Sequence, residues 1–164
     1  MYSVGIVTIS DKGARGERVD ESGRVLTEMV SAQGWEVAET RLISDDFNGI
    51  VDTLIELCDR RKLHLVLTTG GTGFGERDNT PEATLEVAER LVPGLPEAMR
   101  AESAKITPRA YLSRAVAGIR KHTLIVNLPG SPKAVRECLA VILPALPHGL
   151  DMLAGNAHEC ARET

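Results

Sequence analysis

The stretch HLVLTTGGTGFGERDNTPEAT, residues 64–84, decides the fold that this sequence predicts. Residues 63–69, which overlap its beginning, are typical of a strand that is buried on both faces. Thr80-Pro81 places a proline in the first turn of a following helix. A glycine-rich loop joins the two, with glycines at positions 70, 71, 73 and 75. The stretch therefore predicts one strand–loop–helix unit of an α/β protein.

Two further units of the same kind precede this stretch. Residues 4–9 predict a strand, and residues 20–34 carry apolar side chains at helical spacing. Residues 35–43 predict a second strand, and the apolar positions within 50–58 again follow a helical period after Asp45-Asp46. The strand–helix pattern thus occurs three times before residue 90.

The second half of the chain adds a hairpin and more helices. The expected elements are, in order, a short helix over residues 95–99, strands at 113–120 and 123–128, a helix from Pro132 to Ile142, and a helical segment at 150–153. Two residues separate the strands, which predicts an antiparallel hairpin. Ser131 before Pro132 is typical of a helix cap followed by the first helical residue.

Alternating strands and helices predict a three-layer α/β fold. We expect a mainly parallel sheet flanked by helices on both faces, with one antiparallel hairpin. A length of 164 residues suits a single domain over residues 1–164. In such folds the ligand lies beyond the carboxyl ends of the strands. Four segments are expected there: Ser10-Asp11, Asp45-Asp46, Gly70 to Asp78, and Pro129 to Lys133.

Charge and composition exclude several classes of partner. Lys and Arg total 19 against 23 Asp and Glu, and the net charge of −4 argues against a nucleic-acid surface or a polybasic membrane anchor. Aromatic residues make up 3% of the chain, which disfavours stacking on nucleic-acid bases. The three cysteines, Cys58, Cys138 and Cys160, are odd in number and widely spaced. We therefore expect a cytoplasmic protein with neither a disulfide framework nor a zinc site.

The glycine-rich loop is the strongest candidate for a ligand site. Glycines allow positive φ and bring main-chain N–H groups close to an anion, so a phosphate-bearing ligand is the obvious candidate. No Gly-Lys-Ser/Thr closes the loop, and it does not match the dinucleotide-binding fingerprint. Taken alone, a mobile glycine-rich turn is an equally good interpretation.

Carboxylates at neighbouring strand ends indicate a divalent cation. Asp78 stands just before Thr80-Pro81, and Asp45 and Asp46 follow the second strand. Each of the three could simply cap a helix or close a turn. Carboxylates beside an anion site make sense when Mg²⁺ lies between them, because Mg²⁺ takes oxygen ligands and neutralises phosphate charge.

The segment Pro129-Gly130-Ser131-Pro132-Lys133 offers a second place for a phosphate. It supplies a helix N-terminus, a hydroxyl group and a cation, although taken alone an ordinary Ser-Pro helix start with a solvated lysine is the more common explanation. Arg109 and Ser113-Arg114 are further candidate donors, with surface exposure as the alternative. Cys58 and Cys138 fall on apolar helix stripes and are expected in the core.

Several segments together resemble a known family. They are VGIVTISD (4–11), TRLISDD (40–46), the stretch 64–84, PGLPEAMR (93–100), LSR (112–114) and LIVNLPGSPKAVRECL (124–139). In this order they resemble the molybdenum-cofactor biosynthesis proteins of the MoaB/Mog type, over nearly the whole chain. The most specific feature is the pair formed by the GGTG loop, which is followed by Asp78, Thr80 and Pro81, and the later LPGSPK; Asn79 departs from the commoner pattern of the family.

The resemblance implies a molybdopterin adenylyltransferase that assembles as a homotrimer. Molybdopterin is a pterin with a dithiolene and a terminal phosphate; its phosphate would attack the α-phosphorus of ATP, with Mg²⁺, and release pyrophosphate. The resemblance implies catalytic roles for Asp45, which would hold Mg²⁺, and Asp78, which would orient the pterin or its phosphate; these two roles could be exchanged. The implied binding residues are Ser10, Asp11, Gly70, Gly71, Thr72, Gly73, Thr80, Glu97, Ser113, Arg114, Pro129, Gly130, Ser131 and Lys133.

One other interpretation stays open. A free-standing paralogue could bind molybdopterin as a trimeric module without adenylylating it. A second rival, the molybdate-insertion enzyme that shares this domain, is nearly excluded because its other domains need more residues than the 164 of this chain. The resemblance also implies hand-over of the product to such an enzyme. The apolar segment 144–155 suits either a contact between subunits or internal packing. No nucleic acid and no membrane are expected as partners.

Overall fold

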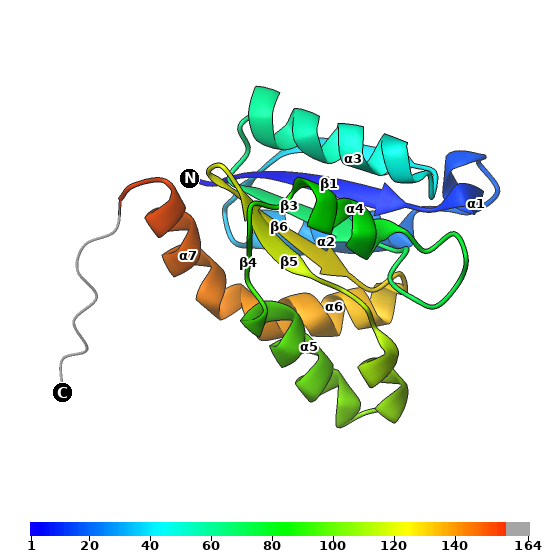
Figure 1. The fold of residues 1–164 in the computed structure, drawn as a ribbon. Coiled ribbons are helices and arrows are strands. Elements are labelled where there is room, and N and C mark those ends of the chain that lie inside the picture. Colours follow the sequence, from blue (N-terminus) through cyan, green and yellow to red (C-terminus); the bar gives the residue numbers. More distant parts are fainter. Residues whose placement is uncertain (157–164) are drawn as a thin grey trace.

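A six-stranded sheet forms the middle layer of the molecule (Figure 1). The computed structural model describes residues 1–156, and Cys160 lies outside them. The strands are β1 (Ser3–Ile9), β2 (Glu36–Ile43), β3 (Leu65–Thr69), β4 (Arg90–Leu91), β5 (Ala117–Arg120) and β6 (Thr123–Leu128). The helices are α1 (Asp11–Ala14), α2 (Glu21–Ala32), α3 (Phe47–Ile55), α4 (Thr80–Val87), α5 (Gly94–Ala104), α6 (Pro132–Ile142) and α7 (Leu146–Leu153).

The order of the strands places a switch point between β1 and β3. The order is β2-β1-β3-β6-β5-β4. The chain therefore goes from β1 to β2 on one side of it and then crosses back to β3 on the other side. β1, β2, β3 and β6 are parallel, and β5 runs antiparallel to both of its neighbours. Thr69 of β3 stands opposite Thr8 and Leu128, so β1, β3 and β6 end level with one another. This confirms the expected mainly parallel sheet with one antiparallel hairpin.

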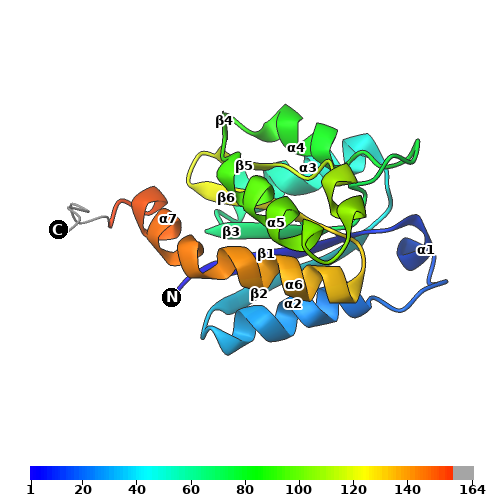
Figure 2. The same cartoon turned by 90° about the horizontal axis from the view of Figure 1, so that it is seen from below.

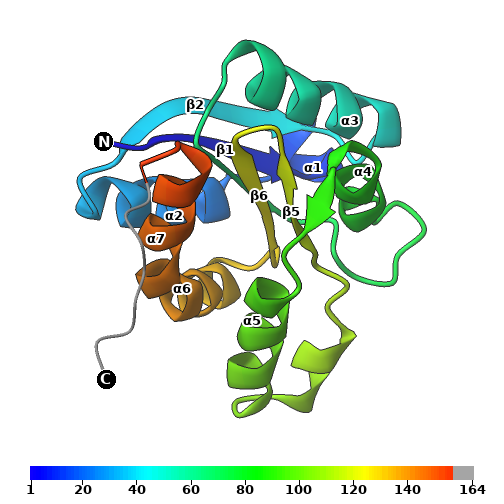
Figure 3. The ribbon, with the colours of Figure 1, turned by 60° about the vertical axis from the view of Figure 1, so that its left-hand side comes forward.

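Two apolar cores, one on each face of the sheet, make the three layers. On one face, Ile6 and Leu67 pack with buried side chains of α2, α5, α6 and α7. On the other face, Val7 and Val66 pack with α3 and α4. Figure 2 shows α2 and α6 side by side on the first face, and Figure 3 shows α5 beside α6, beyond the hairpin. Burial on both faces explains why these strands are rich in Val, Ile and Leu.

Side-chain caps fix where the helices around the sheet edge begin. Asp20 accepts from the Gly23 N–H at 2.9 Å to cap α2, and Asp46 accepts from the Gly49 N–H at 2.8 Å to cap α3. Ser131 accepts from the Ala134 N–H at 3.2 Å, which caps α6 as expected. Each cap satisfies an N–H group that the helix itself leaves free. Because Asp46 caps α3, Asp45 is left for another role.

The structure differs from the sequence prediction at several places. The expected strand at 113–120 begins only at Ala117, because Arg100 donates to the carbonyl groups of Ser113 and Ala115 instead. The last helix begins at Leu146, four residues earlier than expected. A single-turn helix, α1, and a two-residue strand, β4, were not predicted. The helix expected over residues 95–99 is longer and extends to Ala104. In the described part of the chain, no helix is long and apolar enough to cross a membrane.

Candidate functional site

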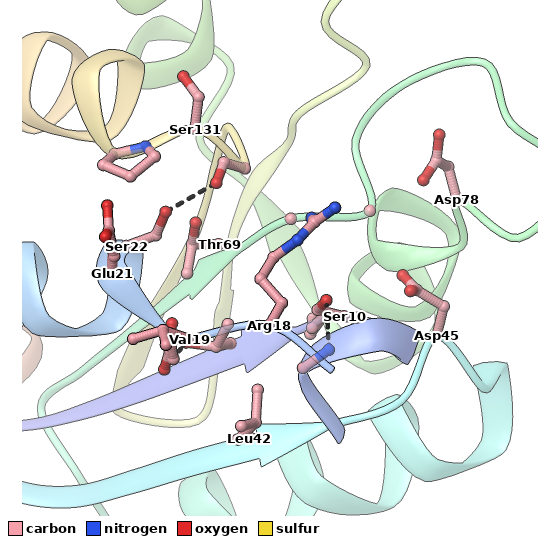
Figure 4. Close-up of a pocket in the computed structure, with 18 residues that line it drawn as sticks. Ser10, Arg18, Val19, Glu21, Ser22, Leu42, Asp45, Thr69, Asp78 and Ser131 are labelled. Atoms are coloured by element: carbon pink, nitrogen blue, oxygen red, sulfur yellow. Dashed lines mark hydrogen bonds between the residues drawn. The ribbon is translucent and has the colours of Figure 1, made fainter. Parts of the chain in front are cut away.

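A cavity of about 620 Å³ lies at the carboxyl ends of β1 and β3, where the strand order switches, and we call it the polar cavity for the charged and hydroxyl-bearing side chains in its lining. Ligands of open α/β sheets bind at this place. Figure 4 shows its lining residues. They come from the end of β1, the segment before α2, the end of β2, the glycine-rich loop and the start of α6. The cavity therefore brings together all four segments that the sequence placed at this edge.

Asp11 and Asp45 bind each other's backbone across the ends of β1 and β2. The Asp11 N–H donates to Asp45 Oδ2 at 2.9 Å, and the Asp45 N–H donates to Asp11 Oδ1 at 3.0 Å. Arg77 adds two hydrogen bonds to the Asp11 carboxylate, at 2.7 and 3.0 Å. These bonds, from Arg77 above all, lower the pKa of Asp11. Asp11 is thus a fully partnered anchor for the loop that carries Arg77.

Asp45 has one carboxylate oxygen without a partner. Its Oδ1 is buried and accepts no hydrogen bond in the structure. Burial raises the pKa of Asp45, and the nearby negative charges of Asp11 and Asp78 add to the rise. A buried carboxylate oxygen normally has a hydrogen-bond donor or a metal ion beside it. Asp45 is therefore the lining residue whose environment indicates a ligand most clearly.

The first two loop glycines cannot be replaced without displacing the cavity wall. Gly70 and Gly71 have φ values of 98° and 69°, which disfavour any residue with a Cβ. A Cβ on Gly70 would lie 2.3 Å from the carbonyl oxygen of Ile9, and one on Gly71 would lie 2.3 Å from Thr80 Oγ1. Thr80 Oγ1 in turn donates to the Gly70 carbonyl at 2.9 Å. Thr80 is thus buried behind the loop and shapes it, without lining the cavity.

Asp78 lies on the same side of the cavity as Asp45 (Figure 4). Its Oδ2 accepts from the Gly75 N–H at 2.9 Å, so one of its oxygens closes a turn of the glycine-rich loop. Aspartate side chains in such turns commonly bind the local backbone. Asp78 therefore fits both interpretations of the sequence, because it lines the cavity as a binding residue would and also closes a turn of the loop.

The opposite side of the cavity is formed by two helix N-termini. The starts of α2 and α6 meet where Ser22 Oγ donates to the Gly130 carbonyl at 2.7 Å. Thr69, at the end of β3, donates to the Pro129 carbonyl at 2.6 Å and ties the same segment to the sheet. Gly130 and Ser131 line the cavity here, whereas Ser10 lines it at the end of β1. Helix N-termini favour negative charge, so this side suits a phosphate.

Sequence reasoning missed Arg18, which also lines the cavity. Its side chain extends from the segment before α2 across the cavity (Figure 4). It stands in a charged stretch, GARGERVDE, in which nothing distinguishes it from Arg15 or Glu17. Only the path of the chain after α1 shows which of these side chains turns inward.

A second, apolar cavity of about 350 Å³ lies next to the first, and we call it the apolar slot. It is lined by α5, by the start of α6 and by the 3₁₀ turn Pro108–Leu112, with Met99, Leu112 and Cys138 among the apolar residues. Polar side chains also reach it, from Arg100, Ser103, Arg109, Ser113 and Glu137.

Some predicted site residues belong to the apolar slot rather than to the polar cavity. Thr72, Gly73, Ser113 and Pro129 line the slot. Thr72 and Gly73 follow directly after Gly71, which lines the polar cavity. The glycine-rich loop is therefore the wall between the two compartments.

Arg114, Glu97 and Lys133 line neither cavity. Arg114 donates to the carbonyl groups of Gly73 and Asp78, each at 2.7 Å, and pairs with Glu82. It therefore braces the glycine-rich loop from behind. Glu97 on α5 and Lys133 on α6 are exposed.

The donors present fit a magnesium ion that is held mainly by a substrate. Residues 1–156 contain no group of three or more His, Cys, Asp or Glu side chains that could hold a metal by themselves. Mg²⁺, however, is usually bound through one or two carboxylates together with phosphate oxygens and water. The bare oxygen of Asp45 is the donor that such a site needs.

The fold and this pair of cavities define an α/β protein whose candidate ligand site lies at the switch point of its sheet. Residues 5–148 match a family model described as "Probable molybdopterin binding domain". The chain belongs to this family of molybdenum-cofactor biosynthesis proteins, as its sequence motifs predicted.

Relatives and solved structures agree with this family. A molybdopterin adenylyltransferase of Helicobacter pylori is 43% identical over 155 residues, covering 93% of this chain and 88% of the relative. One from Escherichia coli is 42% identical, covering 98% and 89%. The crystal structure of the molybdopterin biosynthesis enzyme MoaB from Thermus thermophilus matches with a TM-score of 0.90 and 50% identity, covering 94% of this chain and 98% of that one.

Proposed function

We propose that this protein transfers an adenylyl group from ATP to molybdopterin and so acts in molybdenum-cofactor biosynthesis. The observation that carries the proposal is the pair of adjoining cavities, one polar with a bare carboxylate oxygen and one apolar, divided by the glycine-rich loop. The relatives named molybdopterin adenylyltransferase support it. We further propose that residues 1–164 form a single molybdopterin-binding domain.

The two cavities suit the two substrates differently. The apolar slot offers Met99 and Leu112 to a flat ring, with Ser103 and Ser113 at hydrogen-bonding positions, and it would take the pterin. The polar cavity offers the α6 N-terminus with Gly130 and Ser131 and would take the phosphates of ATP. The pterin phosphate would then reach the α-phosphorus past the glycine-rich loop.

The reaction requires positioning and charge control from the protein. An oxygen of the pterin phosphate bonds to the α-phosphorus of ATP, and the bond to the bridging oxygen breaks with its electron pair leaving on pyrophosphate. Asp45 would hold Mg²⁺, which neutralises phosphate charge, and Asp78 would orient the pterin phosphate. Ser10, Asp11 and Thr80 shape the site around them.

The assay is release of pyrophosphate from Mg-ATP by the purified protein. We expect release only when molybdopterin is added, at one pyrophosphate for each adenylylated pterin. Tight molybdopterin binding without pyrophosphate would contradict the enzyme and favour a binding module. Sedimentation of the same sample tests the proposed homotrimer, which a monomer at micromolar concentration would overturn. Location in the cytoplasm and hand-over to a molybdate-insertion enzyme remain part of the proposal.

One pair of variants tests the assignment of the slot. Ala134 lines the slot at the start of α6, whereas Ala140 is exposed on the same helix. Ala134→Leu fills the slot, so we expect the KM for molybdopterin to rise about tenfold, the equivalent of about 1.4 kcal/mol. The KM for ATP should stay within about twofold. Ala140→Leu is the control and should change neither KM. If Ala134→Leu raises the KM for ATP and not the KM for molybdopterin, the assignment is refuted.

A further inference from the structure

The polar cavity is short of positive charge for the ligand proposed for it. Four of its lining residues are acidic, Asp20, Glu21, Asp45 and Asp78, and Arg18 alone among the lining residues of the described chain is a Lys or Arg. Two helix N-termini contribute partial positive charge, but each corresponds only to about half an elementary charge. Binding of a triphosphate at this place would therefore depend strongly on Arg18.

Arg18 is also the arginine of its segment that is left without a partner. Arg15, three residues earlier, pairs with Glu17 at 3.1 Å. The Asp20 carboxylate accepts from the Gly23 N–H and from the Thr8 hydroxyl. Arg18 makes no hydrogen bond or ion pair with any residue from 1 to 156, and its side chain extends into the cavity (Figure 4). All five of its N–H donors are thus available to a ligand.

The position of Arg18 indicates which phosphates it meets. The segment that carries Arg18 follows β1, on one side of β3, whereas the apolar slot lies on the side of β6, behind Thr72 and Gly73. In phosphoryl-type transfers the attacking and leaving oxygens lie roughly in line on opposite sides of the phosphorus. If the pterin phosphate attacks from the slot, the leaving group departs toward Arg18.

We propose that Arg18 binds the β- and γ-phosphates of ATP and stabilises the negative charge that grows on the departing pyrophosphate. This inference rests on the proposed adenylyl transfer and on the pterin occupying the slot. As the pterin oxygen bonds to the α-phosphorus, the bridging oxygen takes the electron pair of the broken bond into pyrophosphate. A planar guanidinium suits two adjacent phosphate oxygens. Arg18 is then a catalytic residue that touches the leaving group.

The test compares Arg18→Ala with Arg15→Ala, a matched change in the same segment outside the cavity. Equilibrium binding of AMP, ADP, ATP and inorganic tripolyphosphate is measured with Mg²⁺. For Arg18→Ala we expect the Kd of ATP and tripolyphosphate to rise about tenfold or more, while that of AMP stays within about twofold. In the pyrophosphate assay, kcat/KM for ATP should fall about a hundredfold, with partial rescue in Arg18→Lys. Arg15→Ala should resemble the unaltered protein throughout.

The outcomes separate this inference from the proposed function. If the unaltered protein releases pyrophosphate and Arg18→Ala does so equally well, Arg18 has no such role while adenylyl transfer stands. If Arg18→Ala loses the same affinity for AMP as for ATP, or loses affinity for molybdopterin alone, the assignment of Arg18 to the β- and γ-phosphates is likewise overturned. If the unaltered protein releases no pyrophosphate, adenylyl transfer fails, and Arg18 as a leaving-group residue fails with it. Arg18-dependent binding of tripolyphosphate would then show that the anion contact exists without that reaction.

Discussion

Two half-buried aspartates at opposite ends of the sheet have opposite environments. Asp59 stands in the π-helical turn Glu56–Arg60, before β3, and its carboxylate accepts two hydrogen bonds from Arg120, at 3.0 and 2.8 Å. Lys121 adds an ion pair at 3.3 Å. Arg120 lowers the pKa of Asp59, whereas burial raises the pKa of Asp45 at the other end.

The difference lies in pairing, not in residue type. The Asp59 side chain is 19% exposed and that of Arg120 is 22% exposed, so the pair is mostly shielded from water and complete. It joins the turn before β3 to the end of β5 and is a structural contact. Asp45 is left with an oxygen that nothing in residues 1–156 satisfies. An incomplete charge of this kind costs stability and is retained where a ligand completes it.

The largest expected effect is that of Asp45→Asn. Removing the charge should lower pyrophosphate release at least about a hundredfold, as charge stabilisation at a reacting centre is commonly worth about 10² to 10³ in rate (about 3–4 kcal/mol). The melting temperature at pH 7 should stay the same or rise, because the variant no longer buries a bare carboxylate oxygen. Activity and calorimetry on the same preparation check both. A variant that melts much lower and regains activity on cooling would show that Asp45 is merely structural.

Asp59→Asn should have the reverse profile. Breaking the pair with Arg120 leaves a shielded guanidinium with a weaker partner, so we expect a loss of about 1–2 kcal/mol in the free energy of unfolding. For a chain of this length that lowers the melting temperature by about 2–8 °C. Activity well below the melting temperature should be unchanged. If Asp59→Asn loses turnover while it stays folded, the two ends of the sheet are not separate in function.

The pH dependence of stability should distinguish the two aspartates by sign. Because the pKa of Asp45 is raised in the folded protein, its stabilising contribution to the free energy of unfolding is fully present below the pKa of the unfolded chain, about 3.9. That contribution is lost as the pH rises through the pKa of Asp45 in the folded protein. The lowered pKa of Asp59 gives a contribution that is present above about 3.9 and is lost as pH falls through the folded value. Denaturant unfolding of both Asn variants from about pH 2.5 to 7 measures this. The measured quantity is the free energy of unfolding of the unaltered protein minus that of the variant. We expect this difference to fall with rising pH for Asp45→Asn and to rise with pH for Asp59→Asn. Slopes of the same sign for the two variants would contradict the comparison.

The smallest effect is expected for Lys121→Gln. The lysine side chain is 55% exposed and only adds to a carboxylate that Arg120 already pairs, so the loss should stay below about 0.5 kcal/mol. The difference should disappear in about 0.5 M salt, which screens exposed ion pairs. Unfolding in denaturant with and without salt measures both. A loss as large as that of Asp59→Asn would mean that Lys121, not Arg120, is the main partner.

Sequence periodicity predicted the fold well because the strands are buried on both faces. Residues 4–9 and 63–69 are rich in Val, Ile and Leu, and the cap at Ser131 is a local signal. Contacts distant in sequence decided the rest. Arg100 binds the carbonyl groups of Ser113 and Ala115, and the side chain of Asn127 in β6 accepts from the Val116 N–H, so β5 begins only at Ala117. A strand as short as β4 is defined only by its partner β5.

The candidate site was predictable in its composition and only partly in its geometry. That strand ends converge follows from parallel topology, so Ser10, Asp45, Gly70 and Gly130 could be placed at one edge. Which of two adjacent aspartates caps α3 depends on a single hydrogen bond, and the sequence allows either choice. Arg18 carried no local signal at all, since its role depends on the direction in which an irregular segment leaves α1.

The wall between the two cavities has a consequence for how ligands bind. Arg77 ties the glycine-rich loop to Asp11 on one side, and Arg114 ties it to the opposite side through Gly73 and Asp78. A ligand that shifts the loop in one compartment therefore changes the shape of the other. The two binding equilibria are then thermodynamically coupled, and any factor by which the nucleotide alters pterin affinity must equal the factor by which the pterin alters nucleotide affinity.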